Sequence, residues 1–131
     1  MKDIAVTFPG GNRVNAHYDG RTVKTDQSVR NGGDGSAPEP FDLFFVSMAT
    51  CVGIYVLDFC NTRQLNTHGL SVQLQSKRDQ QKKLFTPIRI EIILPADFPE
   101  EHRNAIRKAA RLCTVLKHID IAPTFDVVLS D

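Results

Sequence analysis

The feature that most constrains this chain is an apolar stretch, residues 41–57, in which Asp42 is the only charged side chain. Apolar residues recur in it at steps of three and four, which is the spacing of a helix. They are Phe41, Phe44, Phe45, Met48, Cys51, Val52, Tyr55, Val56 and Phe59. Pro40 suits the first helical position, so we predict a helix from Phe41 to about Arg63. A helix that is apolar on nearly every face must be covered on nearly every face.

The rest of the chain is too small to supply that cover. With 131 residues, the sequence fits one domain, which we place at residues 1–131. One small sheet would shield only one side of the helix. A second copy of the same chain is the simplest remaining cover, so the sequence predicts a homodimer.

Alternating and helical patterns predict the other elements. In order, they are strands at 4–8, 14–18 and 21–25, a Gly-rich loop at 27–40, the long helix, strands at 70–76 and 84–94, a second helix at about 98–118 and a last strand after Pro123. Asp19-Gly20 is a strong two-residue hairpin signal between the second and third strands. The predicted fold is therefore α+β, with the order βββ-α-ββ-α-β.

Composition and charge exclude several classes of function. The formal net charge is +1, and the basic helix residues Arg103, Arg107, Lys108 and Arg111 have no aromatic residues among them, so we expect no nucleic-acid partner. The N-terminal residues lack the apolar run of a signal peptide, and we expect no membrane span. These observations predict a cytoplasmic protein.

Three cysteines are the candidates for chemistry. Their number is odd and their spacing fits neither a zinc site nor a disulfide scaffold. Cys51 and Cys113 each fall on the apolar side of a predicted helix, so packing of those helices would bring the two thiols together. Cys60 is half a helical turn out of phase with Cys51, which indicates a packing role.

Two motifs and the order of elements resemble those of the OsmC/Ohr family, the osmotically inducible protein C and organic hydroperoxide resistance proteins. The first is the stretch from Ala37 to Cys51, in which a Pro, an acid, apolar residues and small residues precede the cysteine. The second is Ala109-Ala110-Arg111-Leu112-Cys113 on the second predicted helix. In addition, Leu84-Phe85-Thr86-Pro87-Ile88 resembles the start of the long strand in a divergent branch of the family.

The resemblance implies a swapped, intertwined homodimer with central helices between β-sheets and an active site at the subunit interface. By the same resemblance, Cys51 is the peroxidatic thiol that attacks an organic hydroperoxide, and Cys113 is the resolving thiol that forms a disulfide with it. A dithiol or lipoyl-type reductant would restore both thiols. No metal or organic cofactor is implied.

The attacking thiol must be a thiolate, and burial in apolar surroundings opposes that state. The family uses an Arg from the first hairpin, held by a carboxylate near the start of the central helix. Arg13 matches the position of that Arg, with Arg21 and Arg30 as weaker candidates, and Asp42 matches a general family acid. Asp42 could equally serve only to cap the helix.

The sequence departs from the family at two positions. Phe41 stands where well-characterised hydroperoxide-reducing members have the Arg-binding Glu, and Thr114 stands where many relatives have Pro. Two other functions therefore stay open. The dimer could bind an apolar small molecule between residues such as Phe41, Phe45, Met48 and Tyr55, or the same disulfide could serve a redox sensor.

Overall fold

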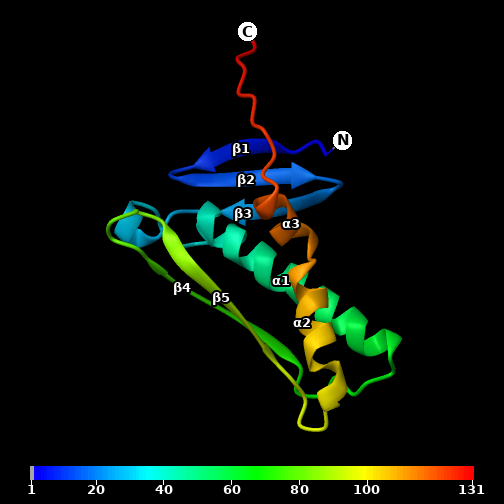
Figure 1. Cartoon of the computed structure of the whole chain (residues 1–131). Helices are drawn as coiled ribbons and strands as arrows, with labels where there is room; N and C mark the ends of the chain where they lie inside the picture. Colours follow the sequence, from blue (N-terminus) through cyan, green and yellow to red (C-terminus); the bar gives the residue numbers. More distant parts are fainter. Residues whose placement is uncertain (1) are drawn as a thin grey trace. The chain divides into compact units, whose positions relative to one another are not determined.

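The computed structural model describes residues 2–131 and has an α+β fold with two antiparallel sheets and three α-helices (Figure 1). The strands are β1 (Ala5–Gly10), β2 (Arg13–Tyr18), β3 (Arg21–Thr25), β4 (Ser71–Arg78) and β5 (Phe85–Ile93). The helices are α1 (Pro40–Thr62), α2 (Arg103–Arg111) and α3 (Thr114–Asp120), with short 3-10 turns at Val29–Asn31 and Glu100–His102. The chain forms two compact units that divide within α1, between Val46 and Ser47.

The N-terminal unit contains the predicted meander β1-β2-β3, with each strand antiparallel to the next. Asp19 and Gly20, at the turn between β2 and β3, both have positive φ, of 48° and 70°. That pair of conformations is the one a two-residue hairpin turn requires, and it is the reason Asp-Gly is favoured there. The hairpin prediction is confirmed.

The loop between β3 and α1 is folded tightly on itself. The Asp26 amide donates to the Pro38 carbonyl at 3.0 Å, and the Gly35 amide donates to the Gln27 carbonyl at 3.0 Å. A side chain at Gly33 would collide with the Gln27 carbonyl, so only glycine fits that close approach. The predicted long loop is therefore an ordered segment with internal hydrogen bonds.

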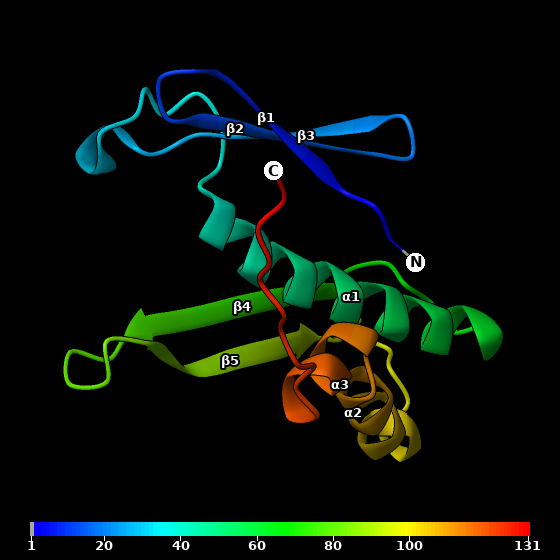
Figure 2. The same ribbon diagram turned by 90° about the horizontal axis from the view of Figure 1, so that it is seen from above.

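In the C-terminal unit, the β4–β5 hairpin runs along α1, and α2 and α3 pack beside the same helix (Figure 2). The buried residues common to this core are Val52, Val56, Phe59, Cys60, Ile106, Ala110 and Cys113. Val72 pairs with Ile92, and both pack against this core from the hairpin. Alternate positions on each strand are thus apolar because only one face of the hairpin is covered.

The second predicted helix is not continuous, which corrects the sequence-based expectation. It breaks between α2 and α3, and Cys113 lies at the break with φ −57° and ψ 145°. The Cys113 sulfur accepts a hydrogen bond from the Leu116 amide at 3.4 Å, so the thiol takes the capping position that a hydroxyl usually fills. Apolar periodicity continues through the break, and the pattern alone therefore concealed it.

The last predicted strand is absent: residues 122–131 form neither strand nor helix in this single chain. Phe125, Val127 and Leu129 are 85%, 92% and 98% exposed, so the alternating side chains contact almost nothing. A strand needs a neighbour for its backbone hydrogen bonds. The prediction of a strand here was wrong for the isolated chain because no strand lies beside the segment.

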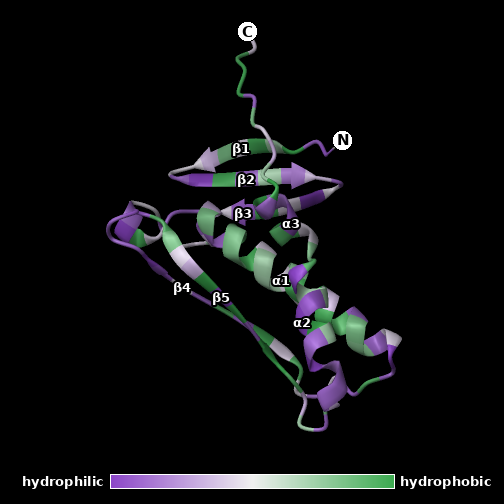
Figure 3. Cartoon of the chain, viewed as in Figure 1, coloured by the Kyte–Doolittle hydropathy of each residue, from purple (hydrophilic) through white to green (hydrophobic). Residues whose placement is uncertain are grey.

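Helix α1 is apolar over much of its length, as its colouring in Figure 3 shows, and it is only partly covered. Its exposed apolar residues are Phe41, Phe44, Val46, Ile54 and Leu57. By length and composition alone α1 could also cross a membrane, which corrects the expectation that no segment is apolar enough. Core helices of soluble proteins pass the same test, so this finding carries little weight for a membrane span.

Candidate active site

Cys51 and Cys113 meet in the core of the C-terminal unit. Cys51 lies on α1 and is half-buried, whereas Cys113 lies at the break between α2 and α3 and is fully buried. Cys51 packs against the core cluster that contains Cys113, and neither cysteine is in a disulfide. The structure therefore brings together the two cysteines that the sequence singled out.

The surroundings of Cys113 favour its protonated form. Burial raises the pKa of the Cys113 thiol, and its interaction with Cys51 raises the pKa further. The hydrogen bond from the Leu116 amide opposes these effects. Cys113 is thus held neutral until another group or a reaction partner changes its environment.

A second contact joins the same two segments one helical turn along α1. The Tyr55 hydroxyl and the Thr114 hydroxyl lie 3.0 Å apart. Tyr55 follows Cys51 by four residues, so both project from one face of α1, while Thr114 directly follows Cys113. The helix break is therefore fixed to α1 at two adjacent points.

Arg111 provides a cation close to the helix break. Its Nη2 donates to Asp120 Oδ1 at 2.9 Å, which links the end of α2 to the end of α3. This hydrogen bond raises the pKa of Arg111, and the negative charge that Cys113 carries when ionised raises it slightly more. Sequence reasoning had placed Arg111 only on a solvated basic face and missed this role.

Cys60 is fully buried among the core residues of α1 and α2, as its packing role predicts. Burial raises the pKa of the Cys60 thiol, and the nearby Arg63 opposes that effect. Arg63 itself covers the Phe59 ring, with its guanidinium carbon 3.6 Å from the ring centroid. Within residues 2–131, no three His, Cys, Asp or Glu side chains are grouped as a metal site requires.

Arg13 is held by carboxylates from the loop before α1. Its Nη2 donates to Asp34 Oδ2 at 2.6 Å, its Nε donates to Ser36 Oγ at 3.3 Å, and Nε lies 4.0 Å from Asp26 Oδ2. The family resemblance implied a carboxylate partner near the start of the central helix, with Asp42 as the candidate acid and helix capping as its alternative role, whereas the partners in the structure lie in the preceding loop. Asp26 and Asp34 were missed because a loop has no periodic pattern that reports which side chains converge.

Asp26 is the buried anchor of that loop. It accepts hydrogen bonds from the Ser36 hydroxyl, the Ser36 amide and the Gln27 amide at 2.6, 3.0 and 2.8 Å. These donors, the Ser36 hydroxyl foremost, lower the pKa of Asp26 from 3.8 to about 2. The carboxylate therefore stays charged at neutral pH. Its hydrogen bonds hold the loop that carries Asp34 and Ser36, the partners of Arg13.

Asp42 lies at the start of α1, where its Oδ2 accepts from the Glu39 amide at 3.0 Å. The first amides of a helix have no partner within the helix, so this bond is a capping interaction. Glu39 in turn accepts from the Ser28 amide and the Asn31 side chain, and its hydrogen bonds to these two residues lower its pKa. Both acids thus order the chain just before α1.

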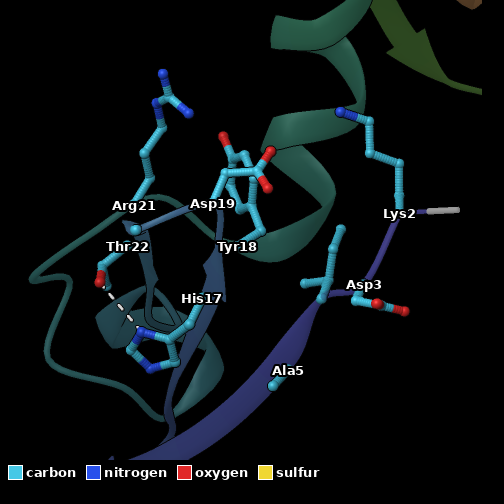
Figure 4. Close-up of a pocket in the computed structure, with 10 residues that line it drawn as sticks. Lys2, Asp3, Ala5, His17, Tyr18, Asp19, Arg21 and Thr22 are labelled. Atoms are coloured by element: carbon cyan, nitrogen blue, oxygen red, sulfur yellow. Dashed lines mark hydrogen bonds between the residues drawn. The ribbon is translucent and has the colours of Figure 1, made fainter.

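The two weaker candidates for the thiolate cation lie in other environments. Arg21 lines a shallow groove of about 740 Å³ between the N-terminal residues and the β2–β3 turn, together with Lys2, Tyr18 and Asp19 (Figure 4). Arg30 is exposed in the 3-10 turn at Val29–Asn31. The groove contains no cysteine.

The sequence also matches a family of known proteins. A model of the family described as OsmC-like protein matches residues 33–128. No curated protein matches the chain.

Several solved structures share the fold. One, described as an osmotic stress induced and detoxification response protein from Psychrobacter arcticus, has a TM-score of 0.75 at 22% identity, over 89% of this chain and 87% of the other. An OsmC-like protein from Mycoplasma pneumoniae has a TM-score of 0.72 at 12% identity, over 93% and 89%. An organic hydroperoxide resistance protein OsmC from Legionella pneumophila has a TM-score of 0.58 at 17% identity, over 91% and 88%.

The structural neighbours establish the α+β architecture, and the family match covers both cysteines and the helices that carry them. It therefore confirms the resemblance drawn from the two cysteine motifs: the chain belongs to the OsmC-like family.

Proposed function

We propose that the protein reduces organic hydroperoxides with Cys51 and Cys113. The observation that carries this proposal is the packing of Cys51 against the core cluster that contains the fully buried Cys113. Its family membership and the Legionella pneumophila neighbour, described as an organic hydroperoxide resistance protein, support the same chemistry. Free thiols of this kind persist in a reducing compartment, so we place the protein in the cytoplasm.

The proposed reaction has three balanced steps. The Cys51 thiolate attacks the hydroperoxide oxygen, the O–O bond breaks, and Cys51 becomes a sulfenic acid while the alkoxide takes a proton and leaves as an alcohol. The Cys113 thiol then attacks the Cys51 sulfur, which forms the disulfide and releases water. A dithiol reductant finally exchanges with that disulfide, returning both thiols and leaving as a cyclic disulfide.

Cys51 is assigned the first attack because it is the more exposed of the two thiols. A hydroperoxide can approach a half-buried sulfur more readily than a fully buried one. Cys113 is protected by burial and by its raised pKa, which suits a thiol that must react only with the sulfenic acid beside it.

Arg13 is assigned to stabilise the Cys51 thiolate. Its guanidinium is oriented by Asp34, Ser36 and Asp26, so its position is fixed before the substrate arrives. Asp42 is assigned the supporting role of capping α1. Phe41, which stands where well-characterised relatives have the Arg-binding Glu, is apolar and half-exposed, which suits an alkyl or lipid hydroperoxide more than hydrogen peroxide.

The working form is proposed to be a swapped homodimer in which the two compact units act as one domain. Two regions support this. The apolar residues of α1 are only partly covered within one chain, and the C-terminal residues 123–131 form an extended segment with exposed alternating apolar side chains. A second copy would cover the first and could pair with the second as a strand.

Turnover tests the proposal. Purified protein should consume cumene hydroperoxide when a dithiol is supplied, Cys51→Ser should abolish consumption, and Cys113→Ser should leave Cys51 as a sulfenic acid prone to over-oxidation. Cys60→Ala is the matched control and should retain turnover if it folds. Full activity in the Cys51→Ser variant would contradict the proposal, and binding of the hydroperoxide without consumption would favour an apolar-ligand protein instead.

The dimer is tested separately by sedimentation. We expect a dimer at micromolar concentration, and removal of residues 123–131 should weaken it. A stable, folded monomer of the full chain would contradict the proposed assembly.

A further inference from the structure

The hydrogen bond between Tyr55 and Thr114 has no part in the reaction as proposed above. The two hydroxyl oxygens are 3.0 Å apart, and the residues are 59 positions apart in the sequence. Tyr55 is half-buried on α1, whereas the Thr114 side chain is exposed at the first position of α3. A hydroxyl pair this specific, beside a reactive thiol pair, calls for a physical role.

The location of the bond suggests that role. Cys51 and Tyr55 are one helical turn apart on α1, and Cys113 and Thr114 are consecutive at the helix break. The thiol contact and the hydroxyl contact therefore lie side by side, and both join α1 to the same short segment. A shift of that segment along α1 would break both contacts together.

The segment is held to α1 by the packing of the fully buried Cys113 and by the hydroxyl bond from Thr114. Leu112 and Cys113 lie outside both helices, and Leu112 is 58% exposed, so it adds little packing. The other hydrogen bonds at the break connect near neighbours in the sequence: the amides of Leu112 and Cys113 donate to the carbonyls of Ala109 and Ala110, the Leu116 amide donates to the Cys113 sulfur, and the Lys117 amide donates to the Cys113 carbonyl. These bonds set local conformation but do not set the distance to α1.

We infer that Tyr55 and Thr114 are positioning residues that hold Cys113 in place for attack on Cys51. The inference rests on the proposed function and deepens it by naming what controls the second step. In that step the Cys113 sulfur bonds to the Cys51 sulfur, the S–O bond of the sulfenic acid breaks, and the hydroxyl leaves as water with the Cys113 proton. The Cys113 sulfur must approach the Cys51 sulfur from a defined direction, so a small displacement of Cys113 slows the attack.

The effect should appear in closure of the disulfide and not in the first reaction of Cys51. Loss of one such hydrogen bond corresponds to about a two- to tenfold change in the fraction of time that Cys113 is correctly placed. Tyr55→Phe and Thr114→Val each remove one hydroxyl with little change of shape. Thr114→Ser keeps the hydroxyl and should behave like the wild type.

The experiment uses the aryl disulfide 5,5′-dithiobis(2-nitrobenzoate), which releases a coloured thiolate at each step. Attack by Cys51 gives a mixed disulfide and the first thiolate, and attack by Cys113 then closes the Cys51–Cys113 disulfide and releases the second. We expect the second phase to slow about two- to tenfold in Tyr55→Phe and in Thr114→Val, with the first phase unchanged. The double variant should be no slower than the slower single variant, because both remove the same bond.

Tyr18→Phe is the matched control, since Tyr18 is the other tyrosine and lies on β2 in the N-terminal unit. Its second phase should match the wild type, and peptide mapping should find Cys60 still reduced in every variant. Wild-type closure rates in both Tyr55→Phe and Thr114→Val would overturn the inference. Equal slowing in Tyr18→Phe or in Thr114→Ser would also overturn it.

This assay separates the inference from the proposed function because it contains no peroxide. If the wild type shows both phases but forms no sulfenic acid with cumene hydroperoxide, the proposed function fails and the positioning role is still measured. If the wild type reduces the hydroperoxide but the variants close at normal rates, only the positioning role fails.

Discussion

The thiol pair and the Arg13 cluster, which consists of Arg13, Asp26, Asp34 and Ser36, surround their reactive groups in opposite ways. Cys51 and Cys113 lie in an apolar core, where burial raises the pKa of Cys113 and favours the neutral thiol. Arg13 lies among carboxylates and hydroxyls in the N-terminal unit, where hydrogen bonds keep Asp26 charged. Each region supplies what the other lacks: one has the nucleophile and the other has the charge.

The difference is one of chemistry: one region has buried thiols, and the other has charged side chains paired with one another. A buried thiol without a cation is a poor nucleophile, whereas Asp34 and Asp26 hold the Arg13 cation in place. In the proposed reaction, Arg13 of one region stabilises the Cys51 thiolate of the other.

The core around the thiols should be the most sensitive to substitution. Ile106 is 2% exposed and packs in the same cluster as Cys113, so Ile106→Ala should lower the free energy of unfolding by about 2–5 kcal/mol. Leu84→Ala is the control, because Leu84 is 63% exposed, and it should change the value by no more than about 0.5 kcal/mol. Urea denaturation measures both, and equal effects would mean that this core does not hold the unit together.

The loop around Arg13 should respond to acid through Asp26. Because its pKa is lowered to about 2, the charged carboxylate stabilises the folded state above the ordinary value of 3.8, and this stabilisation is lost as the pH falls to 2 and below. Asp26→Asn should therefore be less stable than the wild type at neutral pH, with the difference shrinking between pH 4 and pH 2. Denaturation at a series of pH values measures this gap.

Ser36→Ala sharpens the same test. It removes the hydroxyl that contributes most to the lowered pKa of Asp26, so the acid-dependent loss of stability should be smaller than in the wild type and should be complete at a higher pH. A gap that stays constant from pH 4 to pH 2 in Asp26→Asn would show that Asp26 does not act through its charge.

Arg13 should affect the reactivity of Cys51 if the two regions work together. Arg13→Gln should slow alkylation of Cys51 by iodoacetamide about tenfold at pH 7, because the thiolate that Arg13 is proposed to stabilise is the reactive form. Arg21→Gln and Arg30→Gln are the matched controls. Slower alkylation in one of these variants and not in Arg13→Gln would move the assignment to that residue.

The ion pair between Arg111 and Asp120 should have the smallest effect. Its side chains are 59% and 50% exposed, so solvent screens the attraction and Asp120→Asn should cost at most about 1 kcal/mol of stability. Thermal unfolding at low and high salt measures it. A larger loss that persists at high salt would show that the pair holds α3 in place by geometry as well as by charge.

Local patterns predicted most of the fold. The meander, the Asp19-Gly20 turn and α1 follow from alternation, a turn dipeptide and helical periodicity, all of which act between near neighbours in the sequence. The break at Cys113 did not follow, because the apolar stripe runs through it unchanged. The strand after Pro123 did not form because strand pairing depends on a partner that sequence periodicity cannot supply.

The candidate site was predictable in part. The cysteine pair followed from helix faces and from the family resemblance, and the structure places the two thiols in contact. The partners of Arg13 lie in a loop, and the bond from Tyr55 to Thr114 reaches a helix break. At such places the spacing of residues in the sequence does not indicate where a side chain points. Such contacts depend on the folded chain and have no signature of their own in the sequence.

The central claim is that Cys51 and Cys113 form one redox unit. The most direct measurement is mass spectrometry of the intact, reduced protein after one equivalent of cumene hydroperoxide, followed by peptide mapping. We predict the loss of two hydrogen atoms and a single linked peptide pair that contains Cys51 and Cys113, with Cys60 still reduced. An unchanged mass, or a disulfide that includes Cys60 in place of either thiol, would contradict the account.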